Sequence, residues 1–311
     1  MIPNTKILVV GDFILDGYTL GIVDRVSPEA PVPVVNIKNT EYRLGGAANV
    51  ANNISAISGN VGLLSTIGND RYGDICYELI KNAGIKSHLI KSDKSNTIFK
   101  NRITAENQQM VRLDYENKVC ENDNYKLIDE FIKIFNEYEL VVFSDYGKGN
   151  LGKINNIIHI CNEFGIPTLV DPKGKEIMKY ECCSLLKINF NEIKQYVGEI
   201  NTFEQILIKT IELKKRMKVK KMICTLSERG IYFIDENSEG ILIETGNISV
   251  FDVSGAGDTI LGVVSALYSS EIELIDVVQI ANKAGSLVLK KFGTSIITKD
   301  EITKIIEKIC M

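Results

Sequence analysis

A glycine-rich turn in the last fifth of the chain carries the residue types best suited to chemistry. The run Asp252-Val253-Ser254-Gly255-Ala256-Gly257-Asp258-Thr259 leads directly into the apolar segment 260–267. Small residues let backbone N–H groups approach a ligand closely, and the positive end of a following helix attracts an anion. The amides that we expect to stabilise a transferring phosphoryl group belong to Gly255, Ala256 and Gly257.

We expect Asp258 in the first turn of that helix, beside the anion. A carboxylate at this place can accept the proton of an attacking hydroxyl, which predicts phosphoryl transfer with Asp258 as the general base. The alternative is a plain glycine-containing turn whose aspartate only favours the start of a helix.

Two stretches near the start of the chain are suited to a hydroxyl-rich ligand. Leu44-Gly45-Gly46-Ala47-Ala48-Asn49 places two glycines before a helix and a carboxamide in its first turn. Gly11-Asp12-Phe13-Ile14-Leu15-Asp16 places two carboxylates at the end of the first strand, the edge of an open α/β sheet where ligands bind. We expect Asp12, Asp16, Gly45, Gly46 and Asn49 to hold a sugar. The alternatives are a tightly packed junction between a loop and a helix, and a solvated turn.

Cationic side chains are placed to bind a phosphate on that ligand. Period-two alternation puts Lys100 and Arg102 on one face of a strand-like segment, where arginine offers a bidentate contact and lysine a point charge. Arg112, Lys148 and Lys173 are further candidates, the last two at the ends of predicted strands. The alternative is that some of these are ordinary surface cations.

The pattern of apolar residues indicates the elements that must position these groups. Continuous apolar runs, typical of strands buried on both faces, occur at 7–10, 61–67, 140–143, 168–170, 184–188 and 222–226. Helical periodicity occurs between them at 47–57, 74–83, 126–135, 154–164 and 203–217. This alternation predicts an α/β fold with a doubly wound, mainly parallel sheet flanked by helices, in a single domain over residues 1–311.

Two segments interrupt the alternation of strands and helices. Residues 17–43 are polar and contain several prolines and short β-like pieces, and residues 97–116 show β-like alternation. We expect the two segments to pair as a small antiparallel sheet that forms a lid, the alternative being a decorated surface loop. Val34, Val35 and Ile37 would be left partly uncovered in a monomer, so we also expect a homodimer through the lid.

Composition excludes several other classes of protein. Hydrophobic residues at 45% and charged residues at 24% are typical of a globular chain, and a net charge of −4 argues against a nucleic-acid binder. The first residues do not resemble a leader, and the apolar stretch 259–268 is too short to cross a bilayer. Seven cysteines without a C-x-x-C pair predict free thiols in a reducing cytoplasm, and two histidines outside any metal motif predict no histidine site.

These motifs, in this order, resemble the two signatures of the PfkB/ribokinase family of sugar kinases over essentially the whole chain. Asn189-Phe190-Asn191-Glu192 is similar to the family's N-x-x-E motif, and Thr225-Leu226-Ser227-Glu228-Arg229-Gly230 is similar to its nucleotide-contacting stretch. No Walker A pattern is present, so a P-loop kinase is not supported.

The resemblance implies ATP and Mg²⁺ as cofactors. Asn189 and Glu192 would organise Mg²⁺, with Glu192 acting through water, and Thr225, Ser227, Gly230 and Gly257 would contact the nucleotide. On the segment 274–291, Asn282 would border the adenine. A possible K⁺ site behind the anion loop would use Asp252, Ser254, Gly293 and Ser295, the alternative being a plain helix end at Gly293.

Within the family, four stretches are similar to kinases that phosphorylate the anomeric hydroxyl of D-glycero-D-manno-heptose 7-phosphate in ADP-heptose biosynthesis. They are 25–34, 107–114, 144–149 and 170–174. Many such kinases are fused to an adenylyltransferase domain with an H-x-G-H motif, which this sequence lacks, so we expect a stand-alone kinase. The alternatives are a kinase of another sugar, sugar phosphate or nucleoside, or an inactive sugar- or nucleotide-binding regulator.

Overall fold

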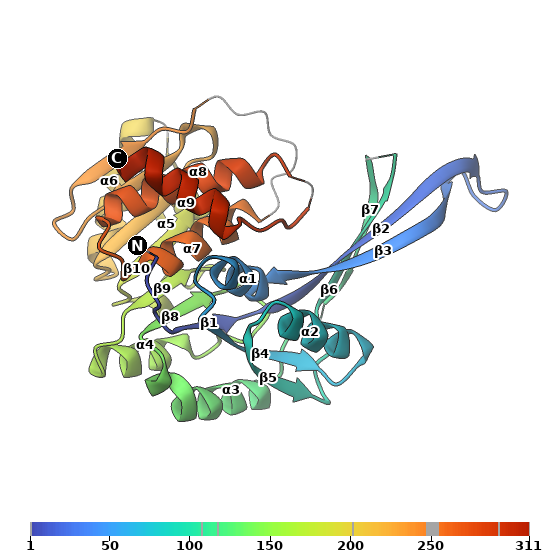
Figure 1. The fold of residues 1–311 in the computed structure, drawn as a ribbon, viewed down its shortest axis with the longest axis horizontal. Helices are drawn as coiled ribbons and strands as arrows, with labels where there is room; N and C mark the ends of the chain where they lie inside the picture. The colour runs from blue at the N-terminus through green and yellow to red at the C-terminus, as the bar shows by residue number, and fades with distance from the viewer. Residues whose placement is uncertain are drawn as a thin grey trace.

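The computed structural model describes residues 2–106, 108–116, 118–200, 202–246, 255–291 and 293–310, and a nine-stranded sheet runs through this part of the chain (Figure 1). Neighbouring strands are parallel from β5 to β11, and β12 and β13 add antiparallel pairs at one edge. In spatial order the strands are β13 (Gly240–Ile243), β12 (Ile231–Ile234), β11 (Lys221–Thr225), β10 (Leu185–Asn189), β9 (Thr168–Asp171), β8 (Leu140–Ser144), β1 (Ile7–Gly11), β4 (Val61–Gly68) and β5 (Lys86–Ser92).

Helices cover both faces of this sheet. One face packs against α1 (Ala47–Ser58), α2 (Arg71–Asn82), α7 (Ala256–Leu267), α8 (Leu274–Val288) and α9 (Lys299–Cys310). The other face packs against α3 (Glu121–Ile134), α4 (Ile154–Glu163), α5 (Phe190–Val197) and α6 (Phe203–Arg216). Short 3₁₀ turns occur at Phe135–Glu137, Ile177–Tyr180 and Ser227–Arg229. Among the helices that the structure describes, none has both the length and the apolar character needed to span a membrane.

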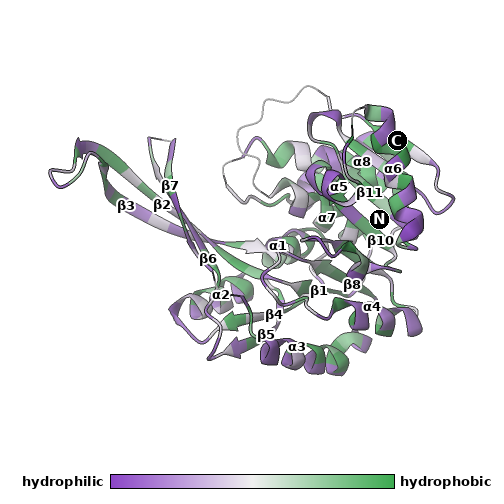
Figure 2. Ribbon diagram, turned by 180° about the vertical axis from the view of Figure 1, so that it is seen from behind, coloured by the Kyte–Doolittle hydropathy of each residue, from purple (hydrophilic) through white to green (hydrophobic). Residues whose placement is uncertain are grey.

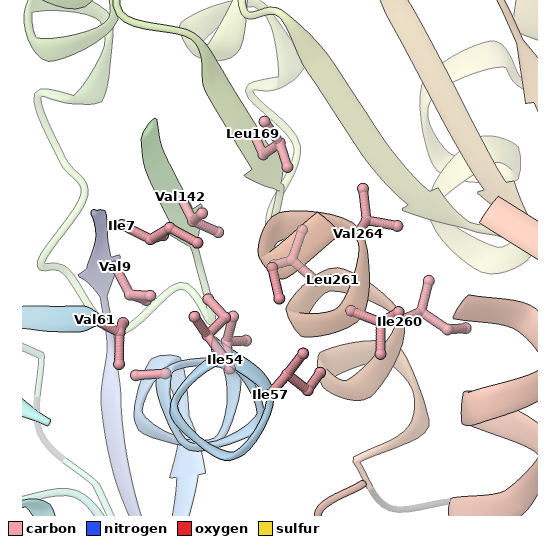
Figure 3. Packing of buried hydrophobic residues seen from close by; sticks show 14 of the residues in the cluster. Ile7, Val9, Ile54, Ile57, Val61, Val142, Leu169, Ile260, Leu261 and Val264 are labelled. Carbon is pink, nitrogen blue, oxygen red and sulfur yellow. The ribbon is translucent and has the colours of Figure 1, made fainter. Parts of the chain in front are cut away.

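Strand β1 shows why the apolar runs form the centre of the sheet. Its side chains alternate between two clusters, with Ile7 and Val9 on the α1 and α7 face and Leu8 and Val10 on the α3 and α4 face. Each fully buried aliphatic side chain stabilises the fold by about 1.5–3 kcal/mol. Figure 2 shows the hydrophobic colour concentrated in central strands such as β1, and Figure 3 shows Ile7 and Val9 facing Ile54 of α1.

The prediction of a doubly wound, mainly parallel sheet is confirmed. Most predicted elements differ from the observed ones by only a few residues, but α3 begins at Glu121, five residues before the predicted start. Its first turn carries Glu121 and Asp123, polar residues that hide the helical period. Three strands were not predicted, namely β5 and β13, whose side chains are mostly exposed or partly exposed, and the short strand β12.

The two interrupting segments form a second sheet of four strands, which we call the lid and which projects from the body (Figure 1). Its order is β3 (Pro33–Gly46), β2 (Phe13–Val26), β6 (Phe99–Ala105) and β7 (Gln108–Tyr115). The expectation of an antiparallel sheet is wrong at its centre, because β2 and β6 pair in parallel. Both strands leave the body in the same direction and each is the first strand of a hairpin, so the pair between them is parallel.

All seven cysteines carry free thiols, as the spacing of these residues predicts. Four of them, Cys76, Cys161, Cys183 and Cys224, are buried in the core. Burial is the main reason that their pKa values lie above the ordinary range, so these thiols stay protonated and pack as small apolar side chains.

Candidate active site

Asp258 lies in the first turn of α7, where the sequence places it. The helix begins after Gly255, which has a φ of 80° in the left-handed region that favours glycine. Asp258 is only 6% exposed, so its carboxylate is removed from bulk water. The turn therefore presents backbone amides and one buried carboxylate at the same end of α7.

Two neutral donors hold the Asp258 carboxylate, one on each oxygen. The Asn49 side-chain amide donates to Oδ2 at 2.8 Å, and the Tyr146 hydroxyl donates to Oδ1 at 2.5 Å. Asn49 is itself fixed by Asn53, whose amide donates to the Asn49 carbonyl oxygen at 2.9 Å. The plane of the carboxylate is therefore set by groups from α1 and from the loop after β8.

Burial raises the pKa of Asp258 above the ordinary aspartate value. The hydrogen bonds from Tyr146 and Asn49 and the charge of Lys187 oppose that rise, because each favours the ionised form. A carboxylate with a raised pKa is a stronger proton acceptor once it is ionised. The electrostatics of the site thus favour Asp258 as a general base.

A polar cavity of about 170 Å³ opens in front of the turn. It joins Asp258 to side chains from the ends of β9 and β10 and from α5. The charged and amide side chains on its wall include Asp171, Lys173, Lys187, Asn189 and Glu192. A phosphoryl group in this cavity would lie between the α7 amides and these residues.

Lys187 is a site residue that the sequence reasoning missed. Its side chain is 5% exposed, and its ammonium lies 2.5 Å from the Asp171 carboxylate. A β-carbon built on Gly257 would lie 2.9 Å from the Lys187 ammonium, so the cation sits against the anion loop. Burial disfavours the charged ammonium, but the carboxylates of Asp171, Glu192 and Asp258 together outweigh burial and raise the pKa of Lys187. The available signal was a lysine within the otherwise apolar strand β10.

Asn189 and Glu192 form the N-terminal cap of α5. The Asn189 side-chain oxygen accepts from the Glu192 backbone N–H at 3.0 Å, and Glu192 Oε2 accepts from the Asn189 backbone N–H at 2.9 Å. The Lys173 ammonium donates to the other oxygen of Glu192 at 3.1 Å. Lys173 was expected at the phosphate of the acceptor, but it lies on the α5 side of the polar cavity because it follows β9.

The oxygen-rich wall of this cavity fits a hydrated Mg²⁺ better than a bare one. Both oxygens of Glu192 already accept hydrogen bonds, and no cluster of three or more His, Cys, Asp or Glu side chains within the described ranges could cage a metal ion. Mg²⁺ characteristically keeps several waters and takes one or two carboxylates together with phosphates of a substrate. Any contact between Mg²⁺ and Glu192 or Asn189 would therefore run through water.

A larger cavity of about 1150 Å³ adjoins the polar one at Asn189 and Gly257. This volume can hold a nucleotide, and the lining is part apolar, as ligand pockets usually are. The residues predicted to contact the nucleotide all line it, namely Thr225, Ser227, Gly230, Gly257 and Asn282.

The Asn282 side chain makes hydrogen bonds to other residues of the wall of this larger cavity. Its amide oxygen accepts from the Thr245 hydroxyl at 2.9 Å, and its amide nitrogen donates to the Glu244 carbonyl oxygen at 3.3 Å. Asn282 therefore shapes the wall by holding the segment after β13 (Gly240–Ile243) against α8.

Asp12 does not face the sugar, which corrects the sequence prediction. Its Oδ2 accepts from the backbone N–H groups of Tyr146 and Lys148 at 2.9 and 3.0 Å. Its Oδ1 accepts from both the backbone and the side-chain nitrogens of Asn150, each at 3.1 Å. Asp12 is fully buried, and its carboxylate is used to fasten the loop after β8.

Asp16 lies at the base of the lid, with Arg102 donating to its carboxylate at 2.6 Å. Gly45 and Gly46 end β3 beside it, and a β-carbon at Gly45 would collide with the Asp16 carboxylate. Arg43, directly opposite Asp16 on β3, was not predicted as a site residue. The base of the lid thus brings together the acid and the cation that the sequence assigns to substrate binding.

The other cations predicted to bind a phosphate near the lid, Lys100, Lys148 and Arg112, are paired with carboxylates. The Lys100 ammonium lies 3.1 Å from Glu116, and Lys148 pairs with the same carboxylate. Arg112 lies directly opposite Arg102 across β6 and β7 and pairs with Asp114 at 2.7 Å. The antiparallel register places Lys100, Arg102 and Arg112 on one face of the lid, as alternation predicts for the first two.

The proposed cation loop can be followed only in part. Gly293 has a φ of 68° and lies against Tyr18, whose hydroxyl accepts from the Thr294 backbone N–H at 2.9 Å. Ser295 is partly buried in the same segment. Asp252 and Ser254, the other two expected ligands, lie outside the described residues.

Comparison with known proteins identifies relatives across nearly the whole chain. The family model described as pfkB family carbohydrate kinase matches residues 4–301. The bifunctional protein HldE of Hydrogenovibrio crunogenus is 36% identical over 299 residues, which are 96% of this chain and 62% of that protein. HldE of Haemophilus influenzae strain PittEE is also 36% identical, over 96% of this chain and 63% of its own length. The chain therefore spans less than two thirds of these relatives.

Solved structures share the fold at lower sequence identity. Phosphofructokinase-2 from Escherichia coli in complex with potassium superposes with a TM-score of 0.83 at 19% identity, covering 99% of this chain and all of that one. Ribokinase from Thermotoga maritima gives a TM-score of 0.76 at 21% identity, over 97% of this chain and 99% of its own. At these identities the likeness concerns the fold alone.

Proposed function

We propose that this chain, which belongs to the pfkB family of ATP-dependent carbohydrate kinases, phosphorylates the anomeric hydroxyl of D-glycero-D-manno-heptose 7-phosphate. The product would be the 1,7-bisphosphate, a step toward ADP-heptose. The observation that carries the proposal is the place of Asp258. This buried carboxylate lines the polar cavity that adjoins the nucleotide-sized one, and it is near enough to Asp16 at the base of the lid for the two charges to interact.

In the proposed reaction, the oxygen of the anomeric hydroxyl attacks the γ-phosphorus of ATP. Asp258 accepts the proton of that hydroxyl during the attack. The new bond forms between that oxygen and the γ-phosphorus, and the bond to the β–γ bridging oxygen breaks to release ADP. The amides of Gly255, Ala256 and Gly257 and the ammonium of Lys187 would stabilise the charge on the moving group. One well-placed donor of this kind is worth about 3–4 kcal/mol in the transition state.

Asn189 and Glu192 would hold Mg²⁺ through water, and the bound ion supplies charge neutralisation for the phosphates of ATP. Thr225, Ser227 and Gly230 would contact the nucleotide in the larger cavity. Gly293 and Ser295, with Asp252 and Ser254, remain our candidates for a K⁺ site. Support for that site comes from the neighbouring phosphofructokinase-2 structure, which is described as a complex with potassium.

The cations at and beside the base of the lid support a phosphorylated acceptor. Arg102, Lys100 and Lys148 converge at the base of the lid, while Arg112 extends the same face toward solvent. Asp16, Asn49 and the turn at Gly45–Gly46 would hold the sugar hydroxyls next to Asp258. We choose the heptose phosphate because the HldE proteins are the relatives that share 36% identity over nearly the whole chain.

A panel of acceptors tests the proposal. Heptose 7-phosphate, fructose 6-phosphate, ribose and a nucleoside are each incubated with ATP and Mg²⁺, ADP release is measured, and phosphorus NMR identifies the phosphorylated position. We expect the highest kcat/KM and an anomeric phosphate with the heptose 7-phosphate. Preferred turnover of fructose 6-phosphate or ribose would replace the substrate, and no turnover with any acceptor would favour a binding regulator.

We also propose that two copies associate through their lids. Exposed apolar side chains on the lid strands include Ile37, Val111 and Leu113, which the strand registers place on one face of the lid. An exposed apolar face of this kind marks an interaction surface. Light scattering should give the mass of a dimer, and Ile37→Asp should shift it to a monomer. Phe164→Asp, at an exposed apolar residue outside the lid, is the matched control. A wild-type monomer at working concentration would refute the association.

A further inference from the structure

The hydroxyl of Tyr146 makes one hydrogen bond in the described part of the chain, and its acceptor is the expected base. The bond to Asp258 Oδ1 is 2.5 Å long and joins residues 112 positions apart. Tyr146 also lines the polar cavity into which a phosphoryl group would fit. Its hydroxyl therefore lies where the acceptor, the base and the phosphoryl group must meet.

The loop that carries Tyr146 is held in place without this hydroxyl. The Tyr146 backbone N–H donates to Asp12, and the Gly147 backbone N–H donates to Asp145 at 2.6 Å. Asp145 is in turn fixed by the hydroxyl of Tyr180 at 2.6 Å. Because these bonds fasten the backbone on both sides of Tyr146, the side-chain hydroxyl is free to serve Asp258.

The proton of this hydrogen bond belongs to Tyr146. Burial, followed by the negative charge of Asp258, raises the pKa of the Tyr146 phenol well above its ordinary value. The phenol is therefore a donor throughout the working pH range, and a donor favours the ionised form of the carboxylate that accepts from it.

We propose that Tyr146 is a positioning residue for proton transfer, which fixes the Asp258 carboxylate and keeps it ionised until the acceptor hydroxyl arrives. This inference rests on the proposed kinase activity and deepens it. Asn49 holds the second oxygen of Asp258 from α1, so the two donors together fix the direction of the remaining lone pairs. The sequence motif around Asp258 does not predict the hydrogen bond from Tyr146, because Tyr146 comes from the loop after β8.

The test is the pH profile of kcat/KM for Tyr146→Phe, measured with the acceptor that the wild type turns over fastest. At low pH the activity falls as Asp258 becomes protonated, and this fall is the acid limb of the profile. Loss of the Tyr146 donor should move the midpoint of the acid limb to higher pH by about one to two units. Activity should therefore fall about 10- to 100-fold on the acid side, with a much smaller loss on the alkaline side. The KM for ATP should change little.

Two further proteins separate positioning from a structural effect. Tyr138→Phe removes a hydroxyl that bonds His88 at 2.8 Å at the opposite end of β8, and it should leave the limb in place. Replacing Tyr146 by 3-fluorotyrosine keeps the ring and the hydroxyl but makes the phenol a stronger donor, so the limb should move to lower pH. If Tyr146→Phe does not fold, the shift of the acid limb in the 3-fluorotyrosine protein alone tests the role of Tyr146.

Each outcome counts for or against the inference. Opposite shifts in the two Tyr146 proteins support it. An unshifted limb, or an equal loss of activity at every pH, overturns it while leaving the kinase assignment intact. A wild type with no kinase activity on any acceptor overturns both.

Discussion

The Asn49 side chain donates a 2.8 Å hydrogen bond to Asp258, although 209 positions separate the two residues. Asn49 lies in the first turn of α1 and Asp258 in the first turn of α7, and both are buried. The two helices pack side by side, with Ile57 facing Ile260 (Figure 3). Asn49, which is expected to bind the sugar, and Asp258, which is expected to activate it, are therefore joined by a direct hydrogen bond.

Asp258→Asn should lower kcat by about 10³-fold, because an amide cannot accept the proton of the acceptor hydroxyl. Binding of ATP should be largely kept, since the nucleotide cavity is lined mainly by other residues. Steady-state kinetics and calorimetry of ATP binding measure the two effects. Asp276→Asn, the same change in the first turn of α8, is the control. Unchanged turnover in Asp258→Asn would remove the base assignment.

The pH dependence of kcat/KM should show an acid limb above the range of an exposed aspartate, which titrates at about pH 4. Burial raises the pKa of Asp258, and the base works only when ionised, so activity falls as pH drops through that raised value. Asn49→Ala should move the limb further up, because it removes a donor to the ionised form. Asn60→Ala, at the far end of the sheet beside Asn4, should not move it. A profile flat down to pH 4 would show that Asp258 is not the titrating group.

The glycine-rich stretches could be predicted because adjacent residues provide all the groups that each turn presents. Gly255 to Asp258 and Gly45 to Asn49 each combine close backbone approach with the start of a helix in adjacent residues. The same holds for the core of the fold, since the apolar runs match the buried strands within a residue or two. The local sequence is sufficient to predict a turn or a strand when residues adjacent in the chain form it.

Other parts of the site depend on contacts between distant segments. Tyr146 and Lys187 reach Asp258 and Gly257 only because β8 and β10 end at the same edge of the sheet. The position of Asp12 after β1 predicts a contact with the sugar, but the loop after β8 supplies four donors that turn its carboxylate inward. Such roles depend on tertiary structure, which residue spacing alone does not encode.

Lys187→Met should both destabilise the protein and lower kcat. The change leaves the Asp171 carboxylate without its 2.5 Å partner, and an unpaired buried charge costs about 3–5 kcal/mol. The double variant Lys187→Met with Asp171→Asn removes that charge, so it should regain most of the free energy of unfolding but not the activity. Urea unfolding and steady-state kinetics separate the two effects. Recovery of full turnover in the double variant would show that Lys187 is only structural.

Arg102→Ala should weaken phosphorylated acceptors selectively. Loss of a partly buried guanidinium that pairs with Asp16 should raise the KM for the sugar phosphate about 10²-fold, with little change in the KM for ATP. The rise in KM for an unphosphorylated sugar should be clearly smaller. Such a sugar has no phosphate to lose a contact with Arg102, so it is affected only because Asp16 is no longer held by Arg102. Arg216→Ala, at an exposed residue in the last turn of α6, is the control. Equal losses for both acceptors would place the phosphate elsewhere.

Glu116→Gln should strengthen binding of the phosphorylated acceptor. The Glu116 carboxylate pairs with Lys100 of the lid and Lys148 of the body, and the bond from Lys148 lowers its pKa, so it is ionised at neutral pH. A carboxylate in that position competes with a phosphate for the same two ammonium groups. Its removal should lower the KM for the sugar phosphate several-fold and leave the KM for ATP unchanged, whereas Glu130→Gln, which breaks an exposed pair with Lys133, should change neither. A raised KM in Glu116→Gln would instead mean that Glu116 holds the two lysines in position for the substrate.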